Sequence, residues 1–434
     1  MPDGSAVILP AFQPAPAQDS VVLALARQQD QHITPFEAAL SLPLIVDESW
    51  EPDVFDRYDV SLLLTLSNDL WAADRCLREA KRRGIPSLFL LDGVLEFRHQ
   101  WTHPWFAARG GAPFLMPVLA DKIACKGWND ARRLESWGNH GKCEVVGVPR
   151  FDRYLPPRLC PRRSAGKRRI LVASARRPWF SDEQRSAVVQ SFARLREFAE
   201  TRSDIEFVWR VRKGLDWRLH LPANGRDSQH EPLEELLGQV DAVITQPSTL
   251  QLEAMLFGLP VALLDFANVP HFEPAAWRIT AESQIGDTVE GLLHPSPARL
   301  SYQDECLNSS LSCLSPATPR MVKLIEDMIA LGRDARARRL PLRFPDFMLP
   351  GESSPPVSLH LDLERQYKDH PTFGNKDLLD LQRRLAMLGR ELDDARERLR
   401  RRSLGYWIEN GCGWITKRVM ETCRGRTAAN GRRA

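Results

Sequence analysis

Short apolar runs alternate with polar or helical stretches through the first third of the chain. The runs hold five to eight residues, are rich in Val, Ile and Leu, and stand at residues 6–10, 21–26, 42–47, 60–67 and 86–92. Runs of this length are typical of parallel strands that are buried on both faces. The clearest helix between them is Trp71 to Arg83, which Asn68 or Asp69 can cap and Gly84 ends. The alternation predicts a doubly wound parallel sheet, an α/β domain, over residues 1–150.

The same rhythm continues over residues 151–338, which we interpret as a second α/β domain. Strands are expected at 168–175 and 205–214, and helices at 182–201, near 232–237 and at 321–338. The most informative stretch is 240–266, which reads as a buried strand, a Ser/Thr turn, a short helix and a second buried strand. Ser248 with Gln251 three residues on predicts a capping box, and Gly258 ends the helix.

A helix that follows a parallel strand in this way has a chemical use. Its free backbone N–H groups and the positive end of its dipole point into the crevice outside the carboxyl ends of the strands, where a phosphate binds well. Glu253 stands one turn in from Thr249 on the same face and could accept hydrogen bonds from ribose hydroxyls. The alternative is an ordinary packing unit with an exposed helical glutamate.

Two stretches resemble glycosyltransferases that have the two-domain B fold (GT-B). Ser-Thr-x-x-x-Glu-Ala at 248–254, followed by Gly-x-Pro-Val at 258–261, is similar to their donor-nucleotide element, notably in bacterial surface-polysaccharide enzymes and the CDP-glycerol glycerophosphotransferase-like group. Gly-Val-Pro-Arg-Phe-Asp at 147–152 resembles the crossing from the first Rossmann-like domain into the second. The two stretches cover a minority of the chain, in the right order. The resemblance implies two Rossmann-like domains that face a cleft, with the helix at 321–338 returning across it.

The resemblance also implies transfer of a sugar or polyol phosphate from a nucleotide-activated donor, which needs a base for the acceptor hydroxyl and groups that hold the diphosphate. Asp92 stands where relatives tend to carry His-Gly. Its carboxylate is then the catalytic base, or the chemistry has been lost and Asp-Gly is only a turn. His99 and His103 are alternative bases, or packed or surface histidines.

The donor side of the cleft is expected to be basic. The strand end at 209–213 stands where relatives often show a Lys/Arg-Pro-His-Pro loop, but the His and Pro are absent. Alternation puts Arg210 and Arg212 on one face, where guanidinium groups can bind diphosphate oxygens, unless this is a solvated strand end. His271 and Glu273 could contact the base or ribose, or belong to a plain loop. The predicted donor-binding residues are Ser174, Arg176, Arg210, Arg212, Lys213, Gln246, Ser248, Thr249 and Glu253.

Composition agrees with a large α/β protein, because 434 residues with 43% hydrophobic and 26% charged side chains can bury two cores. No stretch reaches the roughly 18 apolar residues of a membrane span, and the first residues lack the features of a secretory signal. The eight cysteines show no C-x-x-C spacing, so free thiols in a reducing cytoplasm are expected. No metal-binding Asp-x-Asp stands out. We therefore expect no cofactor and a metal-independent site, and the missing Glu-x7-Glu spacing favours inversion.

The formal charge of +3 is unevenly distributed. Residues 395–434 carry ten Arg and one Lys against three Glu, a net charge of +8, so the rest of the chain carries −5. This mildly acidic body argues against a nucleic-acid groove. Residues 339–372 are rich in Pro and polar residues and are interpreted as a linker.

Residues 373–434 are interpreted as an interaction segment, a coiled coil followed by a basic amphipathic tail. Leucines at a three-four alternation over 378–399 indicate a coiled-coil seam for a homo-oligomer, or an amphipathic helix on its own domain. Aromatic and aliphatic residues among Arg and Lys at 400–426 suit an anionic membrane surface or a partner protein.

The sequence thus predicts a cytoplasmic glycosyltransferase of surface-polysaccharide assembly, peripheral on the inner face of the membrane, with a saccharide or lipid-linked acceptor. Two alternatives stay open: a non-catalytic scaffold that kept the fold, and a sugar-nucleotide epimerase of the same architecture. The missing histidines of the base loop and the donor loop favour the scaffold. The membrane-like tail argues against an epimerase, because an enzyme that acts on a soluble nucleotide sugar does not need one.

Overall fold

The computed structural model describes most of the two predicted domains. Its described residues are 20–26, 31–66, 71–91, 93–98, 115–156, 166–212, 215, 226–227, 230–312, 315–350 and six positions between 384 and 399. The apolar run at 6–10 lies outside them. No helix within these ranges is both long and apolar enough to cross a membrane.

The first sheet is parallel and has the strand order β2-β1-β3-β4-β5-β6. Its strands are β1 (Ser20–Leu25), β2 (Leu44–Asp47), β3 (Asp59–Thr65), β4 (Ser87–Leu90), β5 (Lys122–Cys125) and β6 (Cys143–Val145). Its helices are α1 (Thr34–Glu37), α2 (Val54–Arg57), α3 (Trp71–Arg83) and α6 (Trp128–Ser136). Four of the predicted apolar runs are strands, and α3 has the predicted bounds.

The second sheet is also parallel and has the order β12-β11-β10-β7-β8-β9. Its strands are β7 (Arg168–Ala173), β8 (Ile205–Arg210), β9 (Arg226–Asp227), β10 (Ala242–Thr245), β11 (Val261–Leu264) and β12 (Trp277–Ile279). The helices that follow are α7 (Asp182–Glu200), α9 (Leu233–Leu237), α10 (Thr249–Leu256), α11 (Ile285–Leu293), α12 (Pro297–Ser310) and α13 (Ala317–Ala337), with 3-10 turns η1 (Pro149–Tyr154) and η2 (Glu282–Gln284). The predicted unit at 240–266 is β10, α10 and β11.

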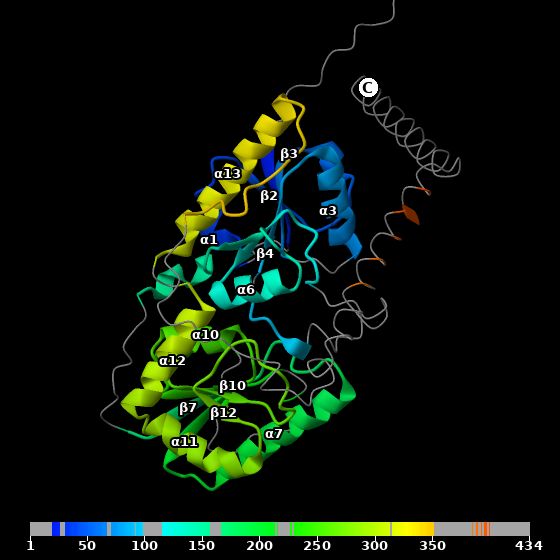
Figure 1. The fold of residues 1–434 in the computed structure, drawn as a ribbon. Coiled ribbons are helices and arrows are strands. Elements are labelled where there is room, and N and C mark those ends of the chain that lie inside the picture. The colour runs from blue at the N-terminus through cyan, green and yellow to red at the C-terminus, as the bar shows by residue number, and fades with distance from the viewer. Residues whose placement is uncertain are drawn as a thin grey trace, which may run out of the picture.

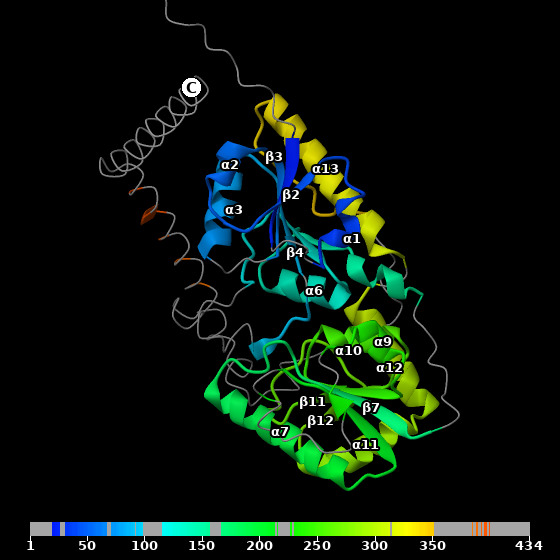
Figure 2. The same ribbon diagram turned by 180° about the vertical axis from the view of Figure 1, so that it is seen from behind.

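The strand order of the second sheet reverses between β7 and β10, so the chain leaves these neighbouring strands in opposite directions. In doubly wound sheets, ligands bind outside the carboxyl ends of the strands at such a point. The loops that follow the strands of both sheets meet between the two domains, which lie one above the other (Figures 1 and 2). The crevice at the β7–β10 reversal therefore faces the first domain.

The last long helix, α13, covers the first domain although it follows the second in sequence (Figure 1). Met321, Leu324 and Met328 are fully buried in one core cluster with Leu62 and Leu64 of β3. The predicted return of this helix across the cleft is confirmed. The first domain is therefore built from two separated stretches of the chain.

The crossing segment at 147–152 fixes the start of α13. Gly147 has a φ of +90°, and a Cβ there would come within 2.9 Å of the Cβ of Ala317, so no larger residue fits. Both carboxylate oxygens of Asp152 accept hydrogen bonds from the first turn of the helix, from the N–H of Ala317 at 2.7 Å and of Thr318 at 2.8 Å. The motif thus joins the two ends of the first domain.

Residues 340–350, which were interpreted as part of a linker, contact the first domain instead. The Lys122 ammonium group, 0% exposed, pairs with Glu144 at 2.8 Å and donates to the carbonyls of Pro345 (2.6 Å) and Asp346 (3.1 Å). The Glu144 carboxylate accepts from the N–H of Met348 at 2.9 Å. We call residues 340–350 the strap.

The region of the predicted coiled coil is described at six helical positions, from Arg384 to Leu399. Leu388, Leu392 and Leu399 are each half or more exposed. The seam and its partner stay predictions, as do the linker beyond the strap and the basic tail.

Candidate active site between the domains

Gln246 organises the crevice at the β7–β10 reversal. Its side-chain oxygen accepts from the N–H of Ala175 at 3.0 Å, and its amide nitrogen donates to the carbonyl of Pro178 at 3.1 Å. The residue is buried, so it holds the loop after β7 in place. Its contact with the nucleotide-activated donor stays a prediction. Both polar atoms of its side chain already form hydrogen bonds within the protein.

Basic side chains gather where β7 and β8 end. The Ser174 hydroxyl accepts from the N–H of Arg212 at 2.9 Å, and the Arg212 guanidinium group donates to the carbonyl of Arg176. Arg176, Arg177 and Arg212 are exposed, and no carboxylate of the described residues forms an ion pair with them. Arg210 instead donates to the carbonyl of Glu231 at 2.6 Å. The predicted basic strand end is therefore present, with its exposed charge on three arginines.

The helix α10 begins at Ser248, as predicted, but the predicted capping box is wrong. The Ser248 hydroxyl lies 3.3 Å from the hydroxyl of Thr245 and caps no N–H of the helix. The Gln251 amide reaches away from the cap and donates to the carbonyl of Pro274 at 2.8 Å. The first turn of α10 therefore has no side-chain cap.

The first domain comes close to this helix start. A Cβ on Gly93, in the loop after β4, would lie 3.6 Å from the hydroxyl of Thr249. The neighbouring Asp92, predicted as the base, lies outside the described residues, as do Lys213, His99 and His103. Their roles stay predictions.

Glu253, predicted as a ribose contact, is buried rather than exposed. Its carboxylate forms an ion pair with Arg150 of the crossing segment, and the Arg150 guanidinium group lies 4.3 Å from the centre of the Phe151 ring. The glutamate therefore ties α10 to the segment between the domains. Its role toward a ribose stays a prediction.

The loop after β11 inserts into the first domain. Phe272, 2% exposed, belongs to the core of that domain. Its ring packs edge-on against Trp137 at 5.5 Å and Phe97 at 6.4 Å between ring centres, and the guanidinium carbon of Arg133 lies 4.5 Å from the ring centre. One aromatic side chain of the second domain is thus part of the core of the first.

The next residue, Glu273, joins a buried charge cluster. The ammonium group of Lys126 lies 2.5 Å from carboxylate oxygens of both Asp130 and Glu273, and all three side chains are buried. Burial raises the pKa of Asp130 to about 7 and lowers the pKa of Arg133 to about 10. Glu273 therefore binds the first domain, and its contact with a base or ribose stays a prediction.

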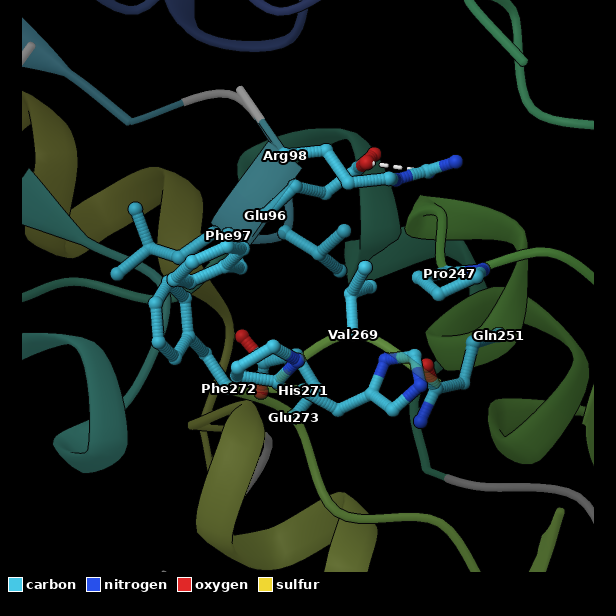
Figure 3. A pocket seen from close by; sticks show the side chains of 12 residues that line it. Glu96, Phe97, Arg98, Pro247, Gln251, Val269, His271, Phe272 and Glu273 are labelled. Carbon is cyan, nitrogen blue, oxygen red and sulfur yellow. Dashed lines mark hydrogen bonds and ion pairs between the residues drawn. The ribbon is translucent and has the colours of Figure 1, made fainter. Parts of the chain in front are cut away.

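A narrow pocket lies between the inserted loop, the start of α10 and the segment after β4 (Figure 3). Glu96 pairs with Arg98 at 2.5 Å, and Arg98 donates to the carbonyl of Pro178 at 2.8 Å. Nε2 of His271 lies 3.0 Å from Oδ2 of Asp265. Burial raises the pKa of Glu96 and lowers the pKa of His271. The free volume is about 10 Å³, which suits about one water or hydroxyl group.

Solved structures show what this fold is similar to. S. aureus MnaA in a co-structure with UDP matches with a TM-score of 0.53 and 15% identity, over 72% of this chain and 98% of that one. The UDP-GlcNAc 2-epimerase from Neisseria meningitidis, bound to UDP-GlcNAc, matches with a TM-score of 0.51 and 14% identity, over 71% and 99%. The wall teichoic acid polymerase TagF matches with a TM-score of 0.45 and 11% identity, over 72% and 89%.

At these identities the likeness concerns the fold: two Rossmann-like domains that face each other, as predicted from the GT-B resemblance. No protein-family profile matches the chain. No curated protein sequence matches it.

Proposed function

We propose that the chain is an enzyme that binds a nucleotide-activated sugar or polyol phosphate on its second domain and transfers the activated group to a saccharide or lipid-linked acceptor. One observation supports this most. Three exposed arginines, Arg176, Arg177 and Arg212, stand beside the sheet reversal, where α10 begins without a side-chain cap.

Each part of that arrangement suits a diphosphate. Backbone N–H groups at the start of α10 can donate to one phosphate, and the helix dipole adds positive potential. Guanidinium groups can bind the remaining oxygens in pairs. Because the leaving nucleotide gains negative charge as the bond to the transferred group breaks, fixed cations there stabilise the transition state. We keep an inverting, metal-independent reaction as part of the proposal.

A sugar-nucleotide epimerase is the second candidate. It is favoured by two structural matches with a TM-score above 0.5, one of which is an epimerase and the other a UDP complex. A transferase releases the nucleotide and adds mass to an acceptor, whereas an epimerase leaves the mass of the nucleotide sugar unchanged. A scaffold protein does neither.

The test is thermal unfolding with UDP, GDP, CDP and CMP donors, followed by mass analysis of products with and without acceptors. A ligand at about a hundred times its dissociation constant stabilises a fold by roughly 2.7 kcal/mol. We expect one nucleotide class to raise the melting temperature. The double variant Arg176→Gln/Arg177→Gln and the single variant Arg212→Gln should each weaken binding at least about tenfold, since hydrogen bonds to charged groups contribute about 1.5 to 3 kcal/mol.

The control is Arg185→Gln, which removes a partly exposed arginine of α7 that pairs with Asp182. It should leave the donor affinity unchanged. If no donor shifts the melting temperature, the enzyme proposal fails and the scaffold alternative gains. If the arginine variants bind as tightly as the control, the donor site lies elsewhere.

A further inference from the structure

One histidine lies at the seam between the domains. Five histidines fall within the described residues, and only His271 is buried, with 8% of its surface exposed. It lines the narrow pocket together with Pro247 and Gln251 of the donor side and with residues 94–98 of the first domain. Figure 3 shows its imidazole ring beside the Gln251 side chain. The ring is thus where an acceptor on the first domain would meet a donor held at α10.

The two ring nitrogens of His271 have different surroundings. Nε2 is buried 3.0 Å from Oδ2 of Asp265, an ion-pair distance at which the angle does not meet that of a hydrogen bond. Nδ1 forms no hydrogen bond with a described residue, so this nitrogen is available to a molecule in the pocket. A carboxylate beside one ring nitrogen stabilises the tautomer with the proton on that side, so Nδ1 carries the lone pair. The ring can accept a proton through Nδ1.

The loop that carries His271 is fixed at several points. Asp265 is itself buried and accepts from the N–H of Val269 at 3.0 Å. His271 forms an isolated antiparallel bridge with Glu96. The next two residues, Phe272 and Glu273, are anchored in the first domain. Such anchoring holds a reacting group in one orientation before the substrate arrives.

We propose that His271, oriented by Asp265, is the general base of the transfer reaction. This assignment rests on the proposed function. Nδ1 takes the proton of the acceptor hydroxyl while the acceptor oxygen bonds to the transferred carbon or phosphorus. The bond from that atom to the phosphate oxygen of the donor breaks, and the nucleotide leaves with the electron pair. A neutral imidazole suits this role, and the pocket has room for about one hydroxyl group.

The pH dependence follows from the surroundings of the ring. Burial lowers the pKa of His271, and the cations Arg278 and Arg98 act in the same direction, while Asp265 opposes them. The backbone of Glu96 forms the isolated bridge with His271, and the Glu96 carboxylate pairs with Arg98. The base is active when neutral, so turnover should be lost as the pH falls through this lowered pKa.

His271→Gln tests the base directly, since glutamine can keep a contact with Asp265 but has no basic nitrogen. We expect kcat to fall by about 10² to 10⁴-fold, a typical loss for a general base. The donor-induced shift in melting temperature should stay. Asp265→Asn should lower kcat less and move the acidic limb of the pH profile. The variants His140→Gln and His294→Gln, each at an exposed histidine, serve as controls and should leave both readouts unchanged.

Turnover within threefold of wild type in His271→Gln would overturn the assignment, and Asp92→Asn would then be the next variant to test. A wild-type protein with no donor shift and no product would point instead to failure of the proposed function. The tautomer gives a readout that needs no activity. Nitrogen-15 spectra, with His271 assigned by its loss in the variant, should show a neutral ring with the proton on Nε2 at pH 7. A charged ring or a proton on Nδ1 would refute the proposal.

Discussion

Replacing Phe272 by alanine should loosen the two domains from each other. The side chain is 2% exposed, comes from the second domain and belongs to the core of the first. Burial of a phenylalanine contributes about 3 kcal/mol at most. The edge-on contacts with Trp137 and Phe97 add about 0.5 to 1.5 kcal/mol each. We therefore expect Phe272→Ala to lower the free energy of unfolding by about 4 kcal/mol, within the usual range for such a substitution.

The assay is equilibrium unfolding in urea, followed by tryptophan fluorescence, because Trp137 packs directly on the Phe272 ring. Loss of the contact between the domains should shift the unfolding of the first domain to lower urea and separate it from that of the second. Phe192→Ala is the matched control, since this phenylalanine of α7 is fully buried in the core of its own domain. It should destabilise the second domain by a similar amount.

The reasoning would be refuted by a loss below about 1 kcal/mol. It would also be refuted if both variants moved the same transition equally, because Phe272 would then have no special part in coupling the domains.

Three further variants probe other parts of the structure. Asp152→Ala removes both side-chain acceptors at the start of α13 and should cost about 1 to 2 kcal/mol in urea unfolding; a cost near zero would show that the cap is dispensable. Lys122→Met leaves the Glu144 carboxylate buried without its cation and should cost about 3 to 5 kcal/mol while exposing the strap to protease; Lys323→Met, at an exposed pair with Asp327, is the control and should do neither. Asp130→Asn tests the charge cluster. Burial raises the folded-state pKa of Asp130 to about 7 from an ordinary 3.8, so the folded state binds more protons than the unfolded state between these pH values. The wild type should therefore gain stability relative to the variant as the pH falls from 7 to 5. A constant difference between the two proteins over that range would contradict this.

Much of the fold was predictable because local patterns determine it. Apolar runs of five to eight residues bounded by turn residues favour buried strands, and the strong start and stop signals of α3 give its bounds. The stretch at 240–266 predicted β10, α10 and β11 for the same reason. The capping box failed because two polar partners compete for each side chain, Thr245 for Ser248 and the Pro274 carbonyl for Gln251.

Features that depend on distant partners were not accessible from the sequence. Glu253 looked like an exposed helical residue, and its partner Arg150 lies 103 positions away. The burial of Lys122 depends on carbonyl groups more than 220 residues later, which no local pattern indicates. Asp265 and His271 are close in sequence, but only the packing of Phe272 into the other domain makes them part of a shared pocket. The sequence could thus predict the strand ends at which the candidate residues lie, while the pairing of their charges could not be predicted from it.

The position of α13 and the strap has a consequence for synthesis of the protein on the ribosome. The last strand of the first sheet ends at Val145, but the helix that covers one face of that sheet and the strap that buries Lys122 end only at Ala337 and Pro350. About 200 residues must be added in between, which takes roughly 10 to 40 s at ordinary rates of translation. During that time the first sheet stands with Leu62 and Leu64 uncovered on one face, while the second sheet, encoded as one continuous stretch, can complete its core. The domain that is made first is therefore the one that finishes last, and its bare face is what a chaperone would meet on the nascent chain.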